Sequence, residues 1–272
     1  MILFPNAKIN LGLNIVERRT DGYHNIETVF YPIGLSDVLE IEPSETCTDY
    51  SFSSSGIMLG GDPEDNLIVK AYRLLRSEYQ ISPIDISLCK QIPFGAGLGG
   101  GSSDAAFMLK ALNELFELKI TTKKLERLAA KLGADCPVFI QNKPVFATGI
   151  GNVFTPVDLS LKGYFLLLVK PDIHVSTPEA YALVVPKKPA ISLLELIKYP
   201  ILEWKTAIKN DFEKSVFAKY PAIQDIKNKL YDMGAIYASM SGSGSSVYGI
   251  FKREPDKTES FANCFVTGGM LE

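Results

Sequence analysis

The stretch PFGAGLGGGSSDAA, residues 93–106, places glycines at 95, 97 and 99–101 directly ahead of two serines and a helix-forming run. It follows IDISLCKQI (84–92), in which apolar residues alternate as they do in a strand. The apolar residues that come after it have the spacing of an amphipathic helix: Ala105, Met108, Leu109, Leu112 and Leu115. The sequence therefore predicts a strand, a glycine-rich loop and a helix, in that order.

Bare backbone directly before a helix is typical of phosphate-binding sites. Glycines let the backbone approach a phosphate closely, and the positive end of the helix favours an anion. Ser102 and Ser103 stand at that end, as a helix cap, phosphate ligands or metal ligands. A flexible loop with a serine-capped helix is the alternative, but the density of glycine and its position favour phosphate binding.

Two familiar nucleotide-binding patterns were compared with this loop. Gly95, Gly97 and Gly100 satisfy G-x-G-x-x-G, but that fingerprint opens a strand–helix–strand unit, whereas TTKKLERLAAKLG (121–133) predicts a second helix closed by Gly133. The P-loop is excluded because no Lys-Ser/Thr pair follows the last glycine. The loop is predicted to hold a phosphate in another structural context.

The composition is that of an ordinary globular protein. The chain has 272 residues, 46% hydrophobic and 22% charged, with 28 Lys+Arg against 31 Asp+Glu and a net charge of -3. The absence of a basic stripe argues against nucleic acid or an anionic membrane as partner. The scattered cysteines favour reduced thiols over a zinc site or disulfides: Cys47, Cys89, Cys136 and Cys264. With no signal-like start or membrane-length apolar run, we expect a cytoplasmic protein.

The N-terminal part mixes strand and helix patterns. KINLGLNI (8–15) alternates as in a half-buried strand, which puts Lys8 and Asn10 on one face. DNLIVKAYRLLRSEY (65–79) predicts a helix with Asp65 as N-cap. In GADCPVF, Asp135 stands two residues before Pro137, where a short helix is expected to start.

The C-terminal part has the same mixed character. FLLLVKPD (165–172) predicts a central strand, and Ser176 and Glu179 form a capping box at the start of a helix. PAIQDIKNKLYDMG predicts a helix ending at Gly234, and AIYASMSGSGSSVYGIF predicts two strands joined by a Gly/Ser loop. A soft boundary at 150–165 predicts an ATP-binding domain over 1–155 and a second domain over 156–272.

Six stretches together resemble the GHMP kinases, the family named for galactokinase, homoserine kinase, mevalonate kinase and phosphomevalonate kinase. They run from residue 5 to residue 246: PNAKINLGLNI, RTDGYHNIETVF, EDNLIVKA, PFGAGLGGGSSDAA, LGADCPVF and MSGSGSS. The resemblance implies an α+β fold of two domains with the active site in the cleft between them, and ATP with Mg²⁺ as cofactors. DGYH and the extended GLGGGSS are similar to members whose small-molecule substrate is a cytidine diphosphate, with no obligate protein partner inferred.

The resemblance also implies the catalytic residues. Asp135 matches the aspartate that accepts the proton of the attacking hydroxyl, although a helix N-cap is the alternative. Lys8 matches the lysine that keeps this carboxylate ionised and stabilises developing charge, although an exposed strand lysine is the commoner case. Asn10, on the same strand face, is expected to hydrogen-bond the substrate.

The remaining roles follow from the same resemblance. Tyr23 and His24 match the pair that recognises cytosine, by stacking and by hydrogen bonds, and Tyr181 falls on the opposite face of the base. Thr177, Gly242 and Gly244 complete the expected substrate site. The expected ATP-binding residues, with Asn66 and Lys90 on the adenine side, are Pro93, Gly95, Gly97, Leu98, Gly99, Gly100, Gly101, Ser102, Ser103, Asn66 and Lys90. The Mg²⁺ ligands are unknown, because no carboxylate cluster marks them.

Three other functions were weighed against this one. A sister kinase acting on mevalonate or homoserine has no base to stack, so DGYH and Tyr181 argue against it. A non-catalytic nucleotide-binding regulator is disfavoured because Asp135 and Lys8 are both present. A dinucleotide-dependent oxidoreductase ranks last, because the loop lacks its sequence context.

Overall fold

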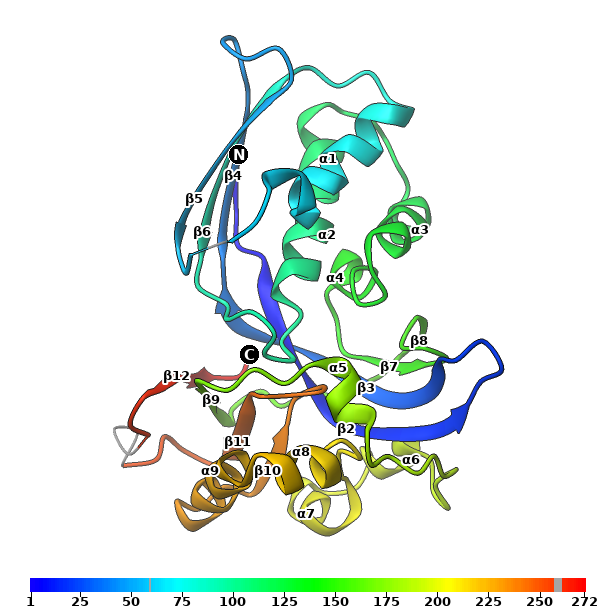
Figure 1. Cartoon of the computed structure of the whole chain (residues 1–272), viewed down its shortest axis with the longest axis vertical. Helices are drawn as coiled ribbons and strands as arrows, with labels where there is room; N and C mark the ends of the chain where they lie inside the picture. The colour runs from blue at the N-terminus through cyan, green and yellow to red at the C-terminus, as the bar shows by residue number, and fades with distance from the viewer. Residues whose placement is uncertain (59, 257–260) are drawn as a thin grey trace. The chain divides into compact units, whose positions relative to one another are not determined.

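A computed structural model of the chain describes residues 1–58, 60–256 and 261–272 (Figure 1). The chain contains both strands and helices, grouped in runs, which confirms the predicted α+β class. The residues form two compact units. Unit 1 consists of Met1–Ala7, Leu35–Phe94 and Gly99–Lys143, and unit 2 consists of Lys8–Gly34, Gly95–Leu98 and Pro144–Glu272.

The division into units differs from the predicted boundary near residue 155. Residues 8–34 and 95–98 cluster with the C-terminal part of the chain, as do residues from Pro144 onward. The reason is sheet pairing. The strand of residues 24–36 pairs with the strand of residues 145–148, so hydrogen bonds join the N-terminal hairpin to a later segment.

Unit 1 is built on one four-stranded sheet in the order β1-β4-β6-β5. β4 pairs antiparallel with both β1 and β6, whereas β5 pairs parallel with β6. The predicted strand before the glycine loop is confirmed as β6. The bounds are β1 Ile2–Leu3, β4 Val38–Pro43, β5 Tyr50–Gly56 and β6 Ile84–Lys90.

The helices of unit 1 all lie on one face of this sheet (Figure 1). Apolar residues of the sheet, such as Leu39 and Ile86, are buried together with Tyr72 of α1 and Leu112 of α2. The helix after the glycine loop, the helix closed by Gly133 and the short helix after Asp135 are confirmed. The bounds are η1 Pro63–Asp65, α1 Leu67–Glu78, α2 Gly100–Leu115, α3 Thr122–Leu132 and α4 Val138–Gln141.

The predicted N-cap of α1 is wrong by one residue. Asp65 ends the short 3₁₀ turn η1, which Asp62 caps by accepting the Glu64 N–H at 2.9 Å. The cap of α1 is Asn66, whose extended backbone lets its Oδ1 accept the Ile68 N–H at 2.9 Å. The chain thus uses one extra turn before α1, which composition alone does not reveal.

Unit 2 contains two four-stranded sheets, in the orders β2-β3-β7-β8 and β10-β11-β9-β12. The second order confirms that residues 165–171 form an inner strand and that the Gly/Ser loop joins two antiparallel strands. The bounds are β2 Asn6–Arg18, β3 His24–Ser36, β7 Val145–Thr148, β8 Val153–Pro156, β9 Phe165–Pro171, β10 Tyr237–Met240, β11 Val247–Phe251 and β12 Cys264–Met270.

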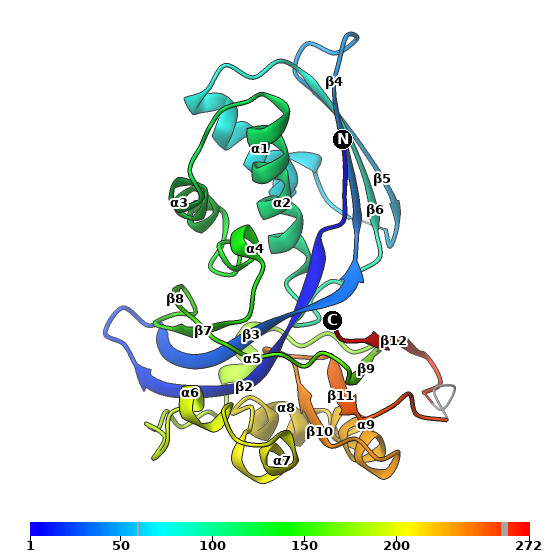
Figure 2. The same ribbon diagram turned by 180° about the vertical axis from the view of Figure 1, so that it is seen from behind.

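Helices of unit 2 cover its second sheet, and α9 packs against β10 and β11 (Figure 2). The capping box of Ser176 and Glu179 is confirmed at the start of α5, and Gly234 follows α9 as predicted. The bounds are α5 Thr177–Tyr181, α6 Leu193–Leu196, η2 Ile201–Glu203, α7 Trp204–Ala207, α8 Glu213–Lys219 and α9 Pro221–Asp232. No helix in the described ranges is both long and apolar enough to span a bilayer.

The strand β2 is not half-buried as its alternation predicted. Residues 7–13 are buried on both faces, including Lys8 and Asn10, which are 3% and 2% exposed. The polar face of β2 is covered by loops of unit 2 instead of water, so the alternation separates a polar interior face from an apolar one.

Gly12 lets neighbouring side chains approach the middle of β2. Its φ is 70°, and a Cβ there would lie 2.6 Å from Ile208 Cγ2 and 2.8 Å from Leu193 Cδ1. We expect Gly12→Ala to lower the free energy of unfolding by about 1–3 kcal/mol, because it adds both backbone strain and overpacking. Urea unfolding measures the change. Gly34→Ala is the matched control in β3, where a Cβ meets nothing within 4 Å; equal stabilities of the two variants would contradict the prediction.

Candidate active site

The glycine-rich loop turns through three left-handed backbone conformations before α2 begins. Gly95, Gly97 and Gly99 have φ values of 56°, 73° and 72°, which L side chains rarely adopt. Gly99 is itself the N-cap of α2, so no side chain caps the helix. The first-turn N–H groups and the positive end of α2 are therefore available to an anion.

The first turn of α2 contains the two predicted serines and no acidic residue. Ser102 is half-buried, whereas Ser103 is fully buried and its Oγ lacks a hydrogen-bond partner among the described residues. The side chain of Ser102 hydrogen-bonds the thiol of Cys136. The start of α2 is thus linked to the turn that carries Asp135.

Asp135 is half-buried in the turn that precedes α4. The N-cap position of α4 belongs to Pro137, and no side chain makes a capping hydrogen bond. Asp135 is therefore not the N-cap of α4. Burial, together with the Asp135 charge, raises the pKa of the adjacent Cys136 thiol to about 11, against the effect of the Ser102 hydrogen bond. The thiol stays protonated and acts as a neutral neighbour of the carboxylate.

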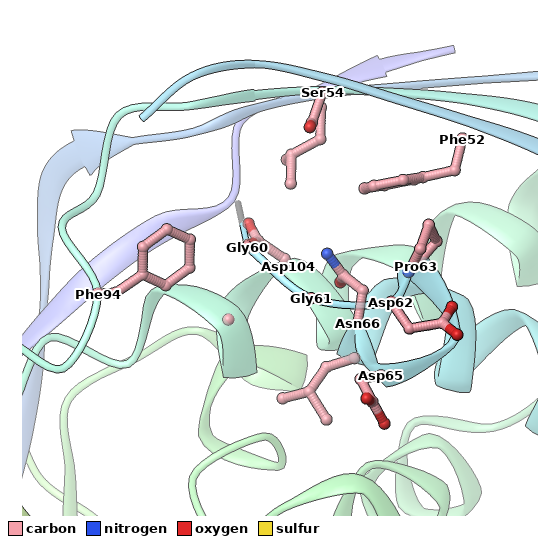
Figure 3. A pocket seen from close by; sticks show the side chains of 13 residues that line it. Phe52, Ser54, Gly60, Gly61, Asp62, Pro63, Asp65, Asn66, Phe94 and Asp104 are labelled. Atoms are coloured by element: carbon pink, nitrogen blue, oxygen red, sulfur yellow. The ribbon is translucent and has the colours of Figure 1, made fainter. Parts of the chain in front are cut away.

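A pocket of about 430 Å³ lies in unit 1 between the sheet and the starts of α1 and α2 (Figure 3). Its walls combine aromatic and aliphatic side chains with a few polar side chains. The amide of Asn66 is among them, and Figure 3 shows its nitrogen pointing into the pocket while its oxygen caps α1. The lining residues are Phe52, Ser54, Gly60, Gly61, Asp62, Pro63, Asp65, Asn66, Leu67, Leu88, Phe94, Gly101 and Asp104. Such a lining suits a planar heterocycle.

Lys90, a predicted adenine-side residue, contacts the pocket wall from behind: its Nζ lies 5.4 Å from the centroid of the Phe94 ring, which lines the pocket. It is 1% exposed, pairs with Asp37 and donates to Asp104 Oδ2 at 2.8 Å. Lys90 does not line the pocket. The Lys90 charge is offset by two carboxylates, and its contact with the nucleotide stays a prediction.

In unit 2, the residues Gly95–Leu98 pack on the second Gly/Ser loop. The Ser241 hydroxyl donates to the Gly97 carbonyl at 2.8 Å, and a Cβ on Gly97 would collide with the Ser241 carbonyl oxygen. Asn210 holds the second loop from the other side, donating to the carbonyls of Met240 and Gly242 at 2.8 Å each. The close packing explains why both loops require glycine.

Lys8 and Asn10 lie beneath these loops. Lys8 Nζ donates to Asn10 Oδ1 at 2.7 Å and to the Gly97 carbonyl at 2.9 Å. Asn10 in turn donates to Thr28 Oγ1 at 2.9 Å. The predicted pair on one strand face is confirmed, and it is joined to the glycine loop by a direct hydrogen bond.

Two of the three aromatic residues expected around cytosine are in contact with each other. The ring stacked on Tyr181 is that of His24, with centroids 4.6 Å apart and planes 23° apart. Phe212 packs edge-on against the same tyrosine at 4.8 Å. Tyr23 is 62% exposed in the β2–β3 turn. A base entering here would compete with His24 for Tyr181.

The other predicted substrate residues occupy two places in unit 2. Thr177 is the exposed first residue of α5, four positions before Tyr181. Gly242 and Gly244 are buried in the second loop with φ values of 56° and 93°. Leu98 is 1% exposed, and its contact with ATP stays a prediction. Pro93 is half-buried at the start of the loop.

Sequence reasoning missed several residues that build these sites. Phe52 and Phe94 form walls of the pocket, Ser241 joins the two loops, and Asp37 holds Lys90. Phe94 and Ser241 had a usable signal, because each stands inside a quoted glycine-rich motif. The others are common residue types whose importance depends on contacts made across the fold.

The described residues contain no group of three or more His, Cys, Asp or Glu side chains that could hold a metal ion. A metal bound with ATP would then take its ligands from phosphates and water, with few from the chain. The uncapped start of α2 and the buried Ser103 hydroxyl fit such a phosphate-bound ion.

Comparison with known proteins agrees with this geometry. The family model described as GHMP kinases N terminal domain matches residues 66–143, and the one described as GHMP kinases C terminal matches residues 197–264. A protein of Bacteroides fragilis named 4-diphosphocytidyl-2-C-methyl-D-erythritol kinase is 60% identical over 271 residues, which is 98% of this chain and 99% of the relative. One of that name from Parabacteroides distasonis is 57% identical over 274 residues and covers 100% of both chains.

Solved structures show the same relationship. The structure titled Crystal structure of 4-(cytidine 5'-diphospho)-2C-methyl-D-erythritol kinase has a TM-score of 0.85 at 32% identity and covers 100% of this chain and 99% of its own. A mevalonate kinase structure has a TM-score of 0.68 at 16% identity, which shows the shared fold alone. The family expected from the sequence motifs is therefore confirmed: the chain belongs to the GHMP kinases.

Proposed function

We propose that the chain transfers the γ-phosphate of ATP to the 2-hydroxyl of 4-diphosphocytidyl-2-C-methyl-D-erythritol, a step of non-mevalonate isoprenoid precursor biosynthesis. One observation supports this proposal above all. Relatives named 4-diphosphocytidyl-2-C-methyl-D-erythritol kinase are 57–60% identical to the chain over 98% or more of its length. The glycine loop ahead of the uncapped α2 supplies the physical means of holding a phosphate.

ATP occupies unit 1 in this proposal. The β- and γ-phosphates lie on the loop of residues 95–103, where left-handed glycines and the start of α2 present N–H groups. The adenine occupies the pocket, between apolar groups such as Phe52 and Leu88 and beside the Asn66 amide. Ser102 or Ser103 would supply a hydroxyl ligand to Mg²⁺, which would offset the charge of the phosphates when bound.

Asp135 is the proposed general base. As the substrate hydroxyl oxygen bonds to the γ-phosphorus, its proton passes to the Asp135 carboxylate and ADP leaves. Lys8 is proposed to stabilise the negative charge that develops, and its donation to Gly97 fixes it beside the phosphate loop. The hydrogen bond between the Ser102 side chain and the Cys136 thiol links the Asp135 turn to the start of α2.

The substrate residues of the proposal all belong to unit 2. Tyr23 and Tyr181 stack on the cytosine, and His24 leaves Tyr181 to hydrogen-bond the edge of the base. Asn10 and Thr177 hydrogen-bond polar groups of the substrate. The backbone at Gly242 and Gly244 receives its diphosphate. We further propose a cytoplasmic enzyme whose partners are small molecules.

ATP consumption that depends on the diphosphocytidyl substrate tests the proposed function. ADP release is followed in a coupled assay, with a parallel reading of nicotinamide absorbance in the absence of coupling enzymes. Turnover with mevalonate or homoserine in place of the cytidine substrate indicates a sister kinase. Binding of ATP without turnover of any of the three indicates a regulator, and a nicotinamide signal indicates an oxidoreductase.

Asp135→Asn preserves the shape of the side chain but removes the base. We expect kcat to fall about 10²–10⁴-fold while ATP and substrate still bind. Steady-state kinetics and equilibrium binding measure the two effects. Asp158→Asn, which removes an exposed carboxylate, is the control. A kcat near that of the control would leave Asp135 with no role as base.

Gly99→Val places a β-branched residue at a φ of 72°, where α2 begins. We expect ATP affinity to fall at least about tenfold, because the loop must leave this conformation, while substrate affinity changes little. Gly163→Val introduces a comparable strain at a φ of 88° in unit 2. Gly163→Val should lower the stability of the protein without lowering its affinity for ATP. Unchanged ATP titration of folded Gly99→Val would mean that the loop does not hold the phosphate.

Tyr23→Ala removes the proposed stacking surface. A stacking contact is worth about 1–3 kcal/mol, so KM for the cytidine substrate should rise roughly tenfold or more. Tyr23→Phe keeps the ring and should lose little, and ATP affinity should stay constant in both. The ring is 62% exposed, so stability should hardly change. A fall in melting temperature with constant KM would instead indicate a packing role.

A further inference from the structure

Three buried charged residues of unit 1 form one cluster that the proposed reaction does not use. Lys90 ends β6, Asp37 precedes β4 and Asp104 lies in α2, and they are 1%, 0% and 3% exposed. The Lys90 ammonium bonds to Asp37 Oδ2 and donates to Asp104 Oδ2 at 2.8 Å. One cation thus joins three separate elements of the unit.

Asp37 also fixes the direction in which the chain leaves β6. Its Oδ1 accepts the N–H of Gln91 at 2.6 Å and the N–H of Ile92 at 2.8 Å. These are charge-assisted hydrogen bonds to the two residues that lead into the glycine loop. The entry of the loop is therefore held by the carboxylate that pairs with Lys90.

The exit of the loop rests on the same ammonium. A Cβ on Gly100 would lie 3.0 Å from Lys90 Nζ and 2.8 Å from Ile92 Cγ2, so only glycine lets α2 begin this close. Asp104, in the next turn of α2, adds the hydrogen bond to Lys90. Ile92 and Gly100, at the two ends of the loop, are therefore both held by the cluster of Lys90, Asp37 and Asp104.

We propose that Lys90 is a positioning residue for nucleotide binding: with Asp37 and Asp104 it fixes Ile92 and Gly100, and so aims the first-turn N–H groups of α2 at the phosphates without contacting the nucleotide. The proposal rests on the proposed use of ATP. Neither Lys90 nor Asp37 lines the pocket, so their effect must pass through the backbone of the loop.

The charge of the cluster supports positioning over simple stabilisation. Two carboxylates face one ammonium, and burial raises the pKa of Asp104 to about 7 against the opposing effect of Lys90. Asp104 Oδ1 is buried without a hydrogen-bond partner among the residues that the structure describes. Burying such a group is costly, and a hydrophobic replacement is often neutral or more stable. What the cluster provides instead is a fixed geometry.

Asp104→Ala and Asp104→Asn form a matched pair that separates the tether from the charge. Both remove the carboxylate charge, but the Asn oxygen can still accept from Lys90, whereas Ala leaves α2 untied. The Asp37 pair with Lys90 remains in both variants. We expect KM for ATP to rise about tenfold in Asp104→Ala and less than threefold in Asp104→Asn, with KM for the cytidine substrate unchanged. Equal KM values for ATP in the two variants would overturn the proposal.

Asp37→Asn excludes a direct contact of Asp104 with the nucleotide as the cause. Asp37 does not line the pocket, so a contact effect leaves KM for ATP unchanged in this variant. The proposal instead expects a rise of about fivefold to tenfold, because the pair with Lys90 is weakened at the loop entry. Glu40→Gln, an exposed charge removal in neighbouring β4, is the control and should match the unmodified chain. A KM in Asp37→Asn equal to that control refutes positioning.

Amide hydrogen exchange gives a readout that does not depend on activity. Loosening the tether should speed exchange of the hydrogen-bonded amides of Gln91, Ile92 and Ser103 at least tenfold in Asp104→Ala, with α3 and the two sheets of unit 2 unchanged. Uniform or unchanged exchange overturns the proposal even if the kinase assay succeeds. Absence of kinase activity in the unmodified chain would refute the proposed function, while the exchange pattern would still report whether the cluster positions the loop.

Discussion

The conformation of the glycine loop is the constraint on which both candidate sites depend. Alternate glycines at 95, 97 and 99 adopt positive φ, so the backbone folds sharply and reaches α2 without a side-chain cap. The Gly97 carbonyl then accepts from Lys8 and Ser241, while the first turn of α2 keeps its N–H groups for a ligand. Any other residue at these positions would meet strain, and at Gly97 it would also collide with Ser241.

Two buried lysines hold different parts of the chain together. Lys90 pairs with the carboxylates of Asp37 and Asp104, which offset its positive charge. Lys8 donates to two neutral oxygens, those of Asn10 and Gly97. A lysine between two acids acts as a structural link, because their charges offset its own. Burial by itself would not distinguish the two residues.

The aromatic group of unit 2 connects substrate choice with local packing. Tyr181 is fixed by the capping box of Ser176 and Glu179 at the start of α5 and by the edge of Phe212. The ring of His24 is stacked on the Tyr181 ring. The imidazole of His24 and a pyrimidine are both flat aromatic heterocycles. A pyrimidine ring can therefore take the place of the His24 ring on Tyr181. Tyr23, in the turn between β2 and β3, is 62% exposed.

The sequence determined the local features, because each depends on residues close together in the chain. The strand before the loop, the helix after it, the capping box at Ser176 and the glycine ends of α3 and α9 all follow from spacing and from backbone preferences. The family followed from short motifs that stand in order along the chain, and the comparisons confirm it.

Only the tertiary structure decided the features that depend on distant contacts. It buried both faces of β2, moved the cap of α1 to Asn66 and placed Lys90 between Asp37 and Asp104. It also brought His24 onto Tyr181, although 157 positions separate them in numbering (181 − 24). A side chain's charge and exposure depend on which groups surround it, and in this fold those groups come from segments whose separation in sequence carries no local signal.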